Sequence, residues 1–182
     1  MIYRPIEPTE TELLENQKRF FKRIEIYMEQ GFDRQRAISF IIDNAEPVEE
    51  PVLDIGTGKG LAAIEIARRG FPVTSVDISE EELQVAFLNA RAANVDGNIR
   101  FHIGDANKLP FEDGHFQLVT MVNVLHHLDE FKGIFKEVSR VLIPGGRFVV
   151  ADFTESGFEI MDRIHSTEGR EHSRLNTVAM DD

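Results

Sequence analysis

Three aspartates follow apolar segments of the sequence at points where buried strands are expected to end. Asp54 follows "PVL", Asp77 ends "PVTSVD" and Asp105 ends "IRFHIGD". Parallel α/β sheets bind ligands at the carboxyl ends of their strands, so these carboxylates would meet at one edge. A single aspartate in such a position is more often a loop residue or a helix cap. Three of them predict a binding site for a polar ligand.

A glycine-rich loop, residues 56–60 with the sequence "GTGKG", follows the first aspartate and leads into a helix. The dinucleotide fingerprint G-x-G-x-x-G requires glycine at the position of Leu61, and the Walker motif requires Gly-Lys-Ser/Thr, so the loop matches neither pattern. Asp54 would repel a pyrophosphate and attract an amino group or a sulfonium. The loop and its carboxylate therefore favour a cationic adenosine derivative over a phosphate ligand.

The position of Asp77 predicts that this ligand contains a ribose. Asp77 lies 21 residues beyond Gly56 (77 minus 56). An acidic side chain at about this separation accepts hydrogen bonds from ribose hydroxyls. Nicotinamide and adenosine sites share the feature, so Asp77 does not separate them, and the argument against NAD rests on the glycine pattern and Asp54.

Segments with the character of strands alternate with helical segments over residues 48–152. This alternation predicts an α/β fold with a Rossmann-like, mostly parallel sheet and helices on both faces. Ser79 and Glu82 have the spacing of a capping box that begins the helix after the second strand. The expected strands read "PVLDI", "PVTSVD", "IRFHIGD", "FQLVTMVNV" and "RFVVADF", with "PGG" as a turn before the last.

Two helices are expected before the first strand. Thr9 and Glu12 have capping-box spacing ahead of the first, and Asp33 can cap the second. They have no place in the alternation and are expected to pack over one end of the sheet. We predict a single domain over residues 1–182, made of a helical cap (1–46), a cofactor-binding core (48–152) and a shortened C-terminal segment (153–182).

Composition excludes several classes of protein. The chain has no cysteine, which excludes disulfides, thiolate nucleophiles and cysteine-ligated metals. Its net charge of −12, without a basic stripe, argues against DNA or RNA as the substrate. No apolar run approaches the roughly 20 residues of a membrane span. The N-terminus also lacks the order of a secretory signal, so a cytoplasmic protein without membrane partners is expected.

Four segments, taken in order, resemble the successive motifs of class I S-adenosylmethionine-dependent methyltransferases. They read "VLDIGTGKG", "VDIS", "GDANKLPFEDGHFQLVTMVNVLHHL" and "VLIPGGRFVVAD". The chain is most similar to the small-molecule branch that includes the ubiquinone and menaquinone biosynthesis methyltransferases. The resemblance implies S-adenosylmethionine as the cofactor, S-adenosylhomocysteine as its product and a small molecule as the methyl acceptor.

The resemblance also implies a role for each residue of the cofactor site. Asp54 would order the glycine loop and contact the methionine amino group, and Asp77 would accept hydrogen bonds from the ribose hydroxyls. At the adenine, Ile78 would pack beside the ring, Asp105 would accept from the amino group, and the N–H of Ala106 would donate to a ring nitrogen. The methionine portion would be lined by the remaining residues: Gly56, Thr57, Gly58 and Asn123.

No catalytic residue and no metal site are predicted. His126 and His127 invite a role as a base, but methyl transfer from a sulfonium needs a base only when the acceptor loses a proton. Packing or shaping of the loop is the favoured interpretation. Tyr3 and Tyr27 could contact a sulfonium through their rings, although Tyr27 fits a core position. The polar segment "RIHSTEGREHSR" is expected to be a solvated loop that could face a substrate.

The C-terminal end departs from the pattern of the family. A complete fold of this class adds two strands after the fifth, whereas residues 153–182 show little strand character and "SGFEIMDRIH" looks helical. The final strands are therefore expected to be short or missing. The edge of the fifth strand would then stay open unless a tail helix or a second subunit, as in a homodimer, covers it.

The sequence thus predicts an enzyme that transfers a methyl group from S-adenosylmethionine to a small acceptor. One alternative is a regulatory or partner protein that binds the cofactor without transferring its methyl group. Another is a dinucleotide-dependent oxidoreductase, which the glycine pattern and Asp54 disfavour. Turnover on a panel of acceptors separates the first two, and binding of NAD would favour the third.

Overall fold

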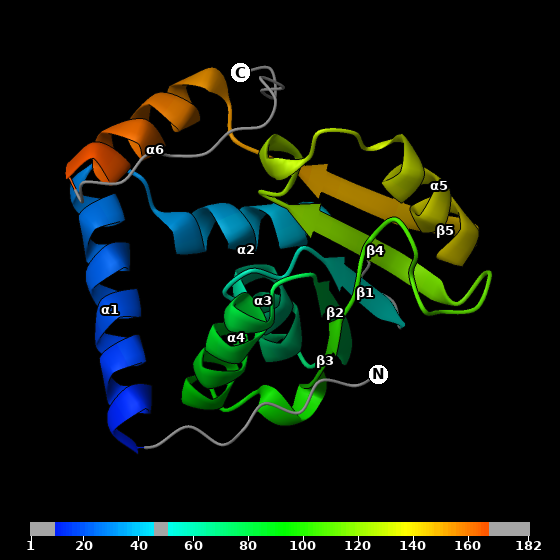
Figure 1. Cartoon of the computed structure of the whole chain (residues 1–182), viewed down its shortest axis with the longest axis horizontal. Coiled ribbons are helices and arrows are strands. Elements are labelled where there is room, and N and C mark those ends of the chain that lie inside the picture. Colours follow the sequence, from blue (N-terminus) through cyan, green and yellow to red (C-terminus); the bar gives the residue numbers. More distant parts are fainter. Residues whose placement is uncertain (1–9, 46–50, 168–182) are drawn as a thin grey trace.

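The structure is a computed structural model that describes residues 10–45 and 51–167. Its centre is a five-stranded parallel sheet with the order β3-β2-β1-β4-β5 (Figure 1). The chain moves outward from β1 to β3 and then returns to place β4 beside β1. The loops that leave β1 and β4 therefore diverge and open a crevice at their carboxyl ends. The strands are β1 (Val52–Ile55), β2 (Val73–Asp77), β3 (Ile99–Ile103), β4 (Phe116–Val122) and β5 (Leu142–Ala151).

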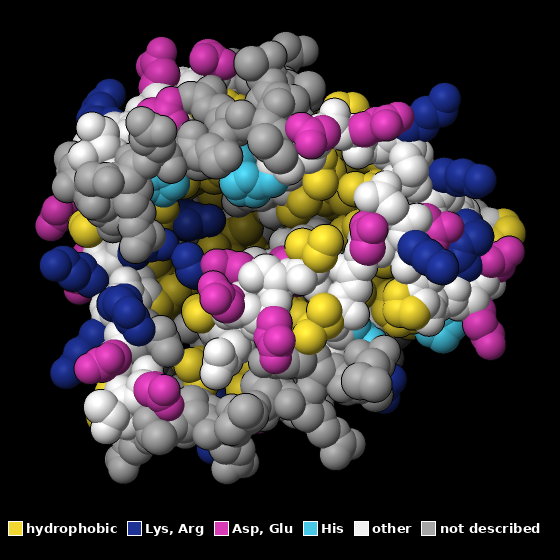
Figure 2. All heavy atoms as spheres, viewed as in Figure 1, with side chains coloured by type: hydrophobic (Ala, Val, Ile, Leu, Met, Phe, Trp, Pro, Cys, Tyr) yellow, Lys and Arg dark blue, Asp and Glu magenta, His cyan; other side chains and the backbone are white. Residues whose placement is uncertain are grey.

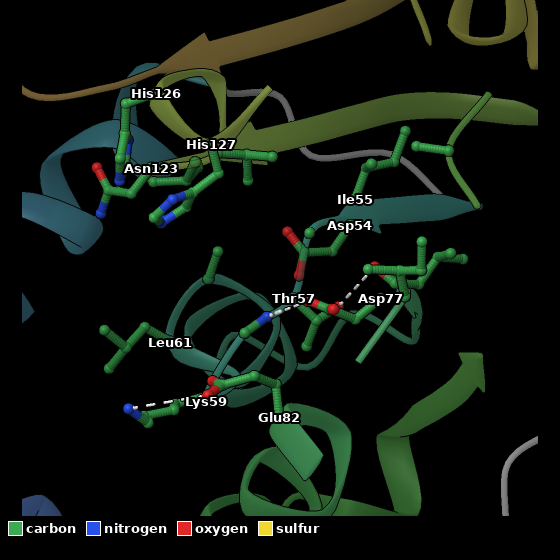
Figure 3. A pocket seen from close by; sticks show the side chains of 18 of the residues that line it. Asp54, Ile55, Thr57, Lys59, Leu61, Asp77, Glu82, Asn123, His126 and His127 are labelled. Atoms are coloured by element: carbon green, nitrogen blue, oxygen red, sulfur yellow. Dashed lines mark hydrogen bonds and ion pairs between the residues drawn. The ribbon is translucent and has the colours of Figure 1, made fainter. Parts of the chain in front are cut away.

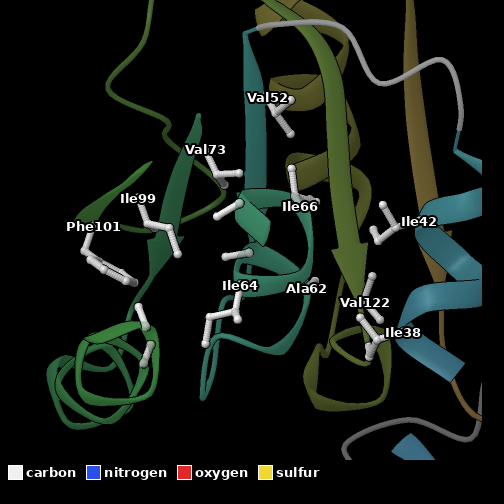
Figure 4. Close-up of a cluster of buried hydrophobic side chains, with 14 of the residues drawn as sticks. Ile38, Ile42, Val52, Ala62, Ile64, Ile66, Val73, Ile99, Phe101 and Val122 are labelled. Atoms are coloured by element: carbon white, nitrogen blue, oxygen red, sulfur yellow. The ribbon is translucent and has the colours of Figure 1, made fainter. Parts of the chain in front are cut away.

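Helices cover both faces of the sheet, as the alternation predicts. On one face, α3 (Leu61–Arg68) and α4 (Glu80–Ala92) share a hydrophobic core with strand residues such as Val52 (Figure 4). On the other face, α5 (Lys132–Val141) shares a second core with strand residues such as Leu53. Successive side chains of a strand point to opposite faces, which is why two neighbouring residues of β1 belong to different cores.

The two leading helices occupy different layers. α2 (Arg34–Asn44) joins the first core through residues such as Ile38, so it packs on a face of the sheet and not over its end as expected (Figure 4). α1 (Glu10–Glu29) lies farther out beside α4 (Figure 1), and its Tyr27 packs against α6 (Glu155–Thr167). Even α1, at 20 residues, is too polar to span a membrane, and no other described helix is long and apolar enough.

Side-chain caps fix where two helices begin. The Asp33 carboxylate accepts a hydrogen bond from a backbone N–H in the first turn of α2 (2.9 Å). Ser79 Oγ accepts from the Glu82 N–H at the start of α4 (3.2 Å). Among the described residues, the return bond of this capping box is absent, because the Ser79 N–H donates to Asp77 instead (2.9 Å). Thr9, expected to cap α1, lies outside the described residues.

The last strand corrects one expectation. "PGG" lies inside β5 and not in a turn before it. The register of β4 with β5 shifts between Phe116 and Leu118, and this irregularity accommodates Gly145 at φ +83°. No strand follows β5 within residues 51–167, and α6 packs against Tyr27 and not along β5. One edge of β5 is therefore open in the described part of the chain.

Candidate active site

A cavity of about 800 Å³ lies between the carboxyl ends of the strands and a wall formed by α1, α2 and α6, called here the helical wall. Figure 2 shows it as a hollow with hydrophobic side chains at its bottom. Small-molecule sites occupy about 300–1,000 Å³, so this volume suits a sizeable ligand or two. Every residue that the sequence predicts for the cofactor site lines the cavity: Asp54, Gly56, Thr57, Gly58, Asp77, Ile78, Asp105, Ala106 and Asn123.

Two backbone donors hold Asp77 at the end of β2. Its Oδ2 accepts from the Gly58 N–H (2.8 Å) (Figure 3), and its Oδ1 accepts from the Ser79 N–H (2.9 Å). A carboxylate oxygen can accept more than one hydrogen bond, so both atoms keep acceptor capacity toward the cavity. The glycine loop therefore presets the side chain that would meet a ribose.

The three glycines of the loop have different surroundings. Gly56 has φ +70°, and a Cβ there would collide with the side chain of Val124. Gly60 precedes α3 with φ +85°, and a Cβ there would stand 3.1 Å from the Cβ of Ala86 on α4. Gly58 is open, since the nearest atom to an added Cβ lies 3.9 Å away. The third glycine, one position early for a dinucleotide fingerprint, thus permits close packing between α3 and α4.

Asp54 is buried in the lining of the cavity, with 2% of its surface exposed. Its Oδ1 accepts from the Thr120 hydroxyl (2.8 Å), whereas no described residue donates to its Oδ2. Burial raises the pKa of Asp54 to about 7; the hydrogen bond from Thr120 opposes the rise, and the charge of Asp77 adds to it. A buried carboxylate with an unused oxygen suits the ammonium group of a ligand.

The residues predicted for the adenine lie around the loop that follows β3. Ile78 lines the cavity and exposes 74% of its surface, although it is large and apolar. Asp105 Oδ1 accepts from the N–H (2.8 Å) and the side-chain amide (3.0 Å) of Asn107, which leaves Oδ2 for a ligand. Glu137 of α5 accepts from the Leu109 N–H (2.8 Å) and so anchors this loop. An apolar platform beside an oriented carboxylate fits a purine with an amino group.

The chain turns sharply after β4 and brings polar groups to the cavity. Asn123 has φ +58°, and its N–H donates to the Ala151 carbonyl at the end of β5 (2.7 Å). The turn η2 (Leu125–His127) follows, with His127 exposed and His126 buried (Figure 3). The two rings lie 3.9 Å apart between centroids, and both residues line the cavity with Asn123. The expected shaping of this loop by the histidines agrees with the burial of His126.

Asp152, which sequence reasoning missed, binds His126 twice. Its Oδ1 lies 2.8 Å from His126 Nδ1, and its Oδ2 accepts from the His126 N–H (3.1 Å); both side chains are almost fully buried. A proton on Nδ1 would be shared with this carboxylate, which assigns the acceptor role to Nε2. Asp152 follows the apolar segment "RFVVA". The rule that singled out Asp54 would therefore have found it.

The helical wall contributes side chains that sequence reasoning also missed. Arg23 of α1 and Arg34 of α2 line the cavity. Tyr27, whose ring the sequence suggested for a sulfonium, is buried, and the Arg34 Cζ lies 4.9 Å from its ring centroid. The protein's own cation therefore occupies one face of this ring. Tyr3 lies outside the described residues. The wall also contributes apolar residues: Phe20, Ile24, Ile38 and Met161.

The polar segment that begins at Arg163 differs from the expected loop. Residues 163–167 form the end of α6, and His165 lines the cavity. Residues 168–174 lie outside the described residues. In the part of the chain that the structure describes, no three His, Asp or Glu side chains are grouped so that they could hold a metal ion.

The family model described as "Methyltransferase domain" matches residues 53–150. This stretch runs from β1 to the end of β5 and includes all the predicted cofactor residues. The chain belongs to the class I S-adenosylmethionine-dependent methyltransferases, and the resemblance noted in the sequence motifs is confirmed.

Individual relatives agree with this assignment. The uncharacterized methyltransferase YcgJ of Bacillus subtilis is 32% identical over 82% of the chain, and its crystal structure matches 73% of the chain and 57% of its own with a TM-score of 0.60. The ubiquinone/menaquinone biosynthesis C-methyltransferase UbiE of Ectopseudomonas mendocina is 34% identical over 64% of the chain. The crystal structure of the [4+2]-cyclase SpnF is 26% identical, with a TM-score of 0.59 over 64% of the chain and 43% of its own. The chain spans 59% of YcgJ and 46% of UbiE, about half the length of these curated relatives.

Proposed function

We propose that this chain binds S-adenosylmethionine in the cavity and transfers its methyl group to a small-molecule acceptor bound beside it. The proposal rests on one observation: the nine predicted cofactor residues share a single cavity with the helical wall. The strand ends offer hydrogen-bond acceptors and an apolar platform, and the wall offers a second surface for another ligand. A transferase needs such an arrangement, because the reacting atoms of its two ligands must come within about 3–3.5 Å.

The groups of S-adenosylmethionine match the strand-end half of the cavity. Asp77 presents two oriented oxygens, which suit the two ribose hydroxyls. Ile78 and Asp105 suit the face and the amino group of adenine. The unused Oδ2 of Asp54 suits the methionine ammonium. Hydrogen bonds to charged groups contribute about 1.5–3 kcal/mol each, so three carboxylates support substantial affinity.

Bound S-adenosylmethionine supplies a methyl group that its sulfonium has already activated. Transfer would join this methyl carbon to a nucleophilic atom of the acceptor and leave the electron pair of the broken carbon–sulfur bond on sulfur, with S-adenosylhomocysteine as the product. The chain would align the acceptor with the carbon–sulfur bond and exclude water from it. His127, exposed on the cavity, can take the proton from an acceptor that loses one.

Calorimetric titration tests the cofactor half of the proposal, with S-adenosylmethionine and S-adenosylhomocysteine as ligands and NAD as the control. We expect micromolar binding of the two adenosine ligands and none of NAD. Transfer is then measured as S-adenosylhomocysteine formed in the presence of each member of an acceptor panel. Failure of both adenosine ligands to bind would contradict the proposal.

A second candidate function is cofactor binding without methyl transfer. The similarity to SpnF, a [4+2]-cyclase, supports this candidate, because proteins that share one fold can catalyse different reactions. The acceptor panel separates the two functions. Tight binding of S-adenosylhomocysteine without turnover on any acceptor would favour the second.

We also propose that a second copy of the chain covers the open edge of β5. This strand has ten residues, most of them half-buried, and strand edges left open readily pair with another chain. Light scattering after size exclusion should give the mass of a dimer. A monomer at every concentration would exclude this arrangement.

A further inference from the structure

Among the described residues, arginines line the cavity on one side only, and the lysine of its lining, Lys59 of the glycine loop, has its Nζ 4.0 Å from Glu82 Oε1. The carboxylates of Asp54, Asp77 and Asp105 lie at the strand ends, whereas Arg23 and Arg34 belong to the helical wall. Figure 2 shows the same division: basic side chains gather on the side of the hollow next to α1 and α2, and acidic ones on the opposite rim. The cofactor groups assigned to the strand ends use the carboxylates, so the basic wall requires a separate explanation.

Arg34 is half-buried beside a second cation. Its Cζ lies 4.9 Å from the centroid of the Tyr27 ring, and none of the described Asp or Glu residues forms an ion pair with it. Burial lowers the pKa of Arg34 from its ordinary value, Tyr27 opposes the change, and the charge of Arg23 adds to it. A desolvated cation next to another cation is electrostatically unfavourable. An anion bound to both Arg34 and Arg23 would offset this repulsion.

The cofactor can account for only part of this basic wall. S-adenosylmethionine carries one anionic group, the carboxylate of its methionine portion, which can form a bidentate pair with one guanidinium. The cavity presents two, Arg23 and Arg34. An arginine has five donors, so either residue can bind an anion while it keeps its other contacts. One arginine is therefore available to a second anionic ligand.

The surface around the arginines indicates the chemical character of the second ligand beyond its anionic group. The helical wall is otherwise mostly apolar, with Phe20, Ile24 and Met161 facing the cavity. We propose that the methyl acceptor is an amphipathic acid, whose carboxylate or phosphate group binds to Arg23 and Arg34 while its apolar body lies against the helical wall. This inference rests on the proposed function and narrows its substrate class.

Amphipathic probes test the charge of the acceptor. Octanoate, octyl phosphate and 1-octanol share one alkyl chain and differ in their head group. Each is titrated into the full chain saturated with S-adenosylhomocysteine. We expect at least one of the two acids to bind about tenfold more tightly than octanol, and the better acid distinguishes carboxylate from phosphate. Equal affinities for all three probes would overturn the inference.

Charge-removing variants locate the anion. Arg23→Met and Arg34→Met each remove one guanidinium, and Arg36→Met removes an exposed one from the same helix as Arg34 and is the matched control. We expect one or both cavity variants to weaken binding of the preferred acid about tenfold and to leave octanol binding unchanged. Arg36→Met should change neither. Thermal unfolding shows whether each variant is folded, and Arg34→Lys, which keeps the charge, should retain part of the affinity.

A comparison of two adenosine ligands separates the acceptor from the cofactor. 5′-Methylthioadenosine lacks the carboxylate of S-adenosylhomocysteine. Replacing an arginine that binds this carboxylate should therefore weaken binding of S-adenosylhomocysteine and leave binding of 5′-methylthioadenosine unchanged. Loss of S-adenosylhomocysteine affinity in both cavity variants, with acid binding unchanged, would overturn the inference, because both arginines would then serve the cofactor. Failure of the wild-type chain to bind S-adenosylhomocysteine would instead overturn the proposed function, and this inference with it.

Discussion

The carboxylate of Asp152 binds His126 through both of its oxygens, one 2.8 Å from the ring Nδ1 and the other 3.1 Å from the backbone nitrogen. The N–H of Phe153 donates to the same carboxylate (2.8 Å). His126 belongs to the turn after β4, and Asp152 directly follows β5. A single side chain therefore joins two strand ends at the border of the cavity and fixes the turn that carries His127.

Asp152→Ala should lower the free energy of unfolding by about 2–5 kcal/mol, because it leaves buried donors of His126 and Phe153 without an acceptor. Urea unfolding followed by circular dichroism measures the change. Asp129→Ala removes an exposed carboxylate shortly after the same turn and is the control. Asp152→Asn, which keeps an acceptor oxygen, should lose less than the alanine variant. If the two alanine variants unfolded alike, the carboxylate would have no structural role.

The sheet was predictable because each of its strands has a clear apolar segment bounded by turn residues. The strand-end position of Asp54, Asp77 and Asp105 followed from the same pattern, since parallel strands bring their carboxyl ends to one edge. The turn predicted before the strand at "PGG" was wrong, because Pro144 and Gly145 lie within β5, in the irregular stretch between the pairs Phe116–Leu142 and Leu118–Arg147. Local sequence signals could not show that β5 pairs with β4 on both sides of these residues.

The helical wall was not predictable, because its inward face depends on how helices pack over long sequence separations. A helical pattern identifies α1, but nothing local indicates that Arg23 faces a cavity while the apolar Phe21 is 55% exposed. Likewise, the packing of Tyr27 under Arg34 requires the turn between α1 and α2 to be known. Position relative to the sheet, and not residue type, decides which of these side chains can reach a ligand.

Asp77→Ala should weaken binding of S-adenosylhomocysteine about 10- to 100-fold, because it removes two acceptors for the ribose and frees the Gly58 N–H that orders the loop. Calorimetric titration gives the dissociation constants. Glu81→Ala, an exposed carboxylate on the following helix, is the matched control and should bind as the wild type does. Unchanged affinity in the Asp77 variant would remove this residue from the proposed site.

Gly56→Ala should destabilise the fold, because the new Cβ collides with Val124 and the backbone has φ +70°. Overpacking costs about 1–3 kcal/mol, and the left-handed conformation adds roughly 1–2 kcal/mol. Val124→Ala in the same chain removes the collision. The double variant should therefore recover the overpacking cost and keep the cost of the left-handed backbone. Urea unfolding of the single and double variants measures both costs. Equal stabilities of Gly56→Ala with and without Val124→Ala would show that no collision occurs.

Binding of S-adenosylhomocysteine should strengthen about tenfold between about pH 6 and pH 8 if the ligand ammonium requires the ionised form of Asp54. Burial raises the pKa of this carboxyl to about 7, so it is mostly protonated at the lower pH and mostly ionised at the higher. Calorimetric titration across this range measures the dependence. Asp54→Asn cannot ionise and should bind weakly with a flat profile. The same slope in both proteins would assign the dependence to another group.

The stability of the ligand-free protein should follow the opposite trend. The pKa of Asp54 is about 7 in the folded state, against an ordinary value of 3.8, so between these values the folded protein keeps a proton that the unfolded chain has lost. The contribution of Asp54 to the free energy of unfolding therefore falls as the pH rises from about 4 to 7. Asp54→Asn lacks this contribution, and its stability relative to the wild type should increase over the same range in urea unfolding. If the stability of Asp54→Asn relative to the wild type decreased with pH, the fold itself would favour the ionised carboxylate. The charge of Asp54 would then be stabilised without a ligand cation.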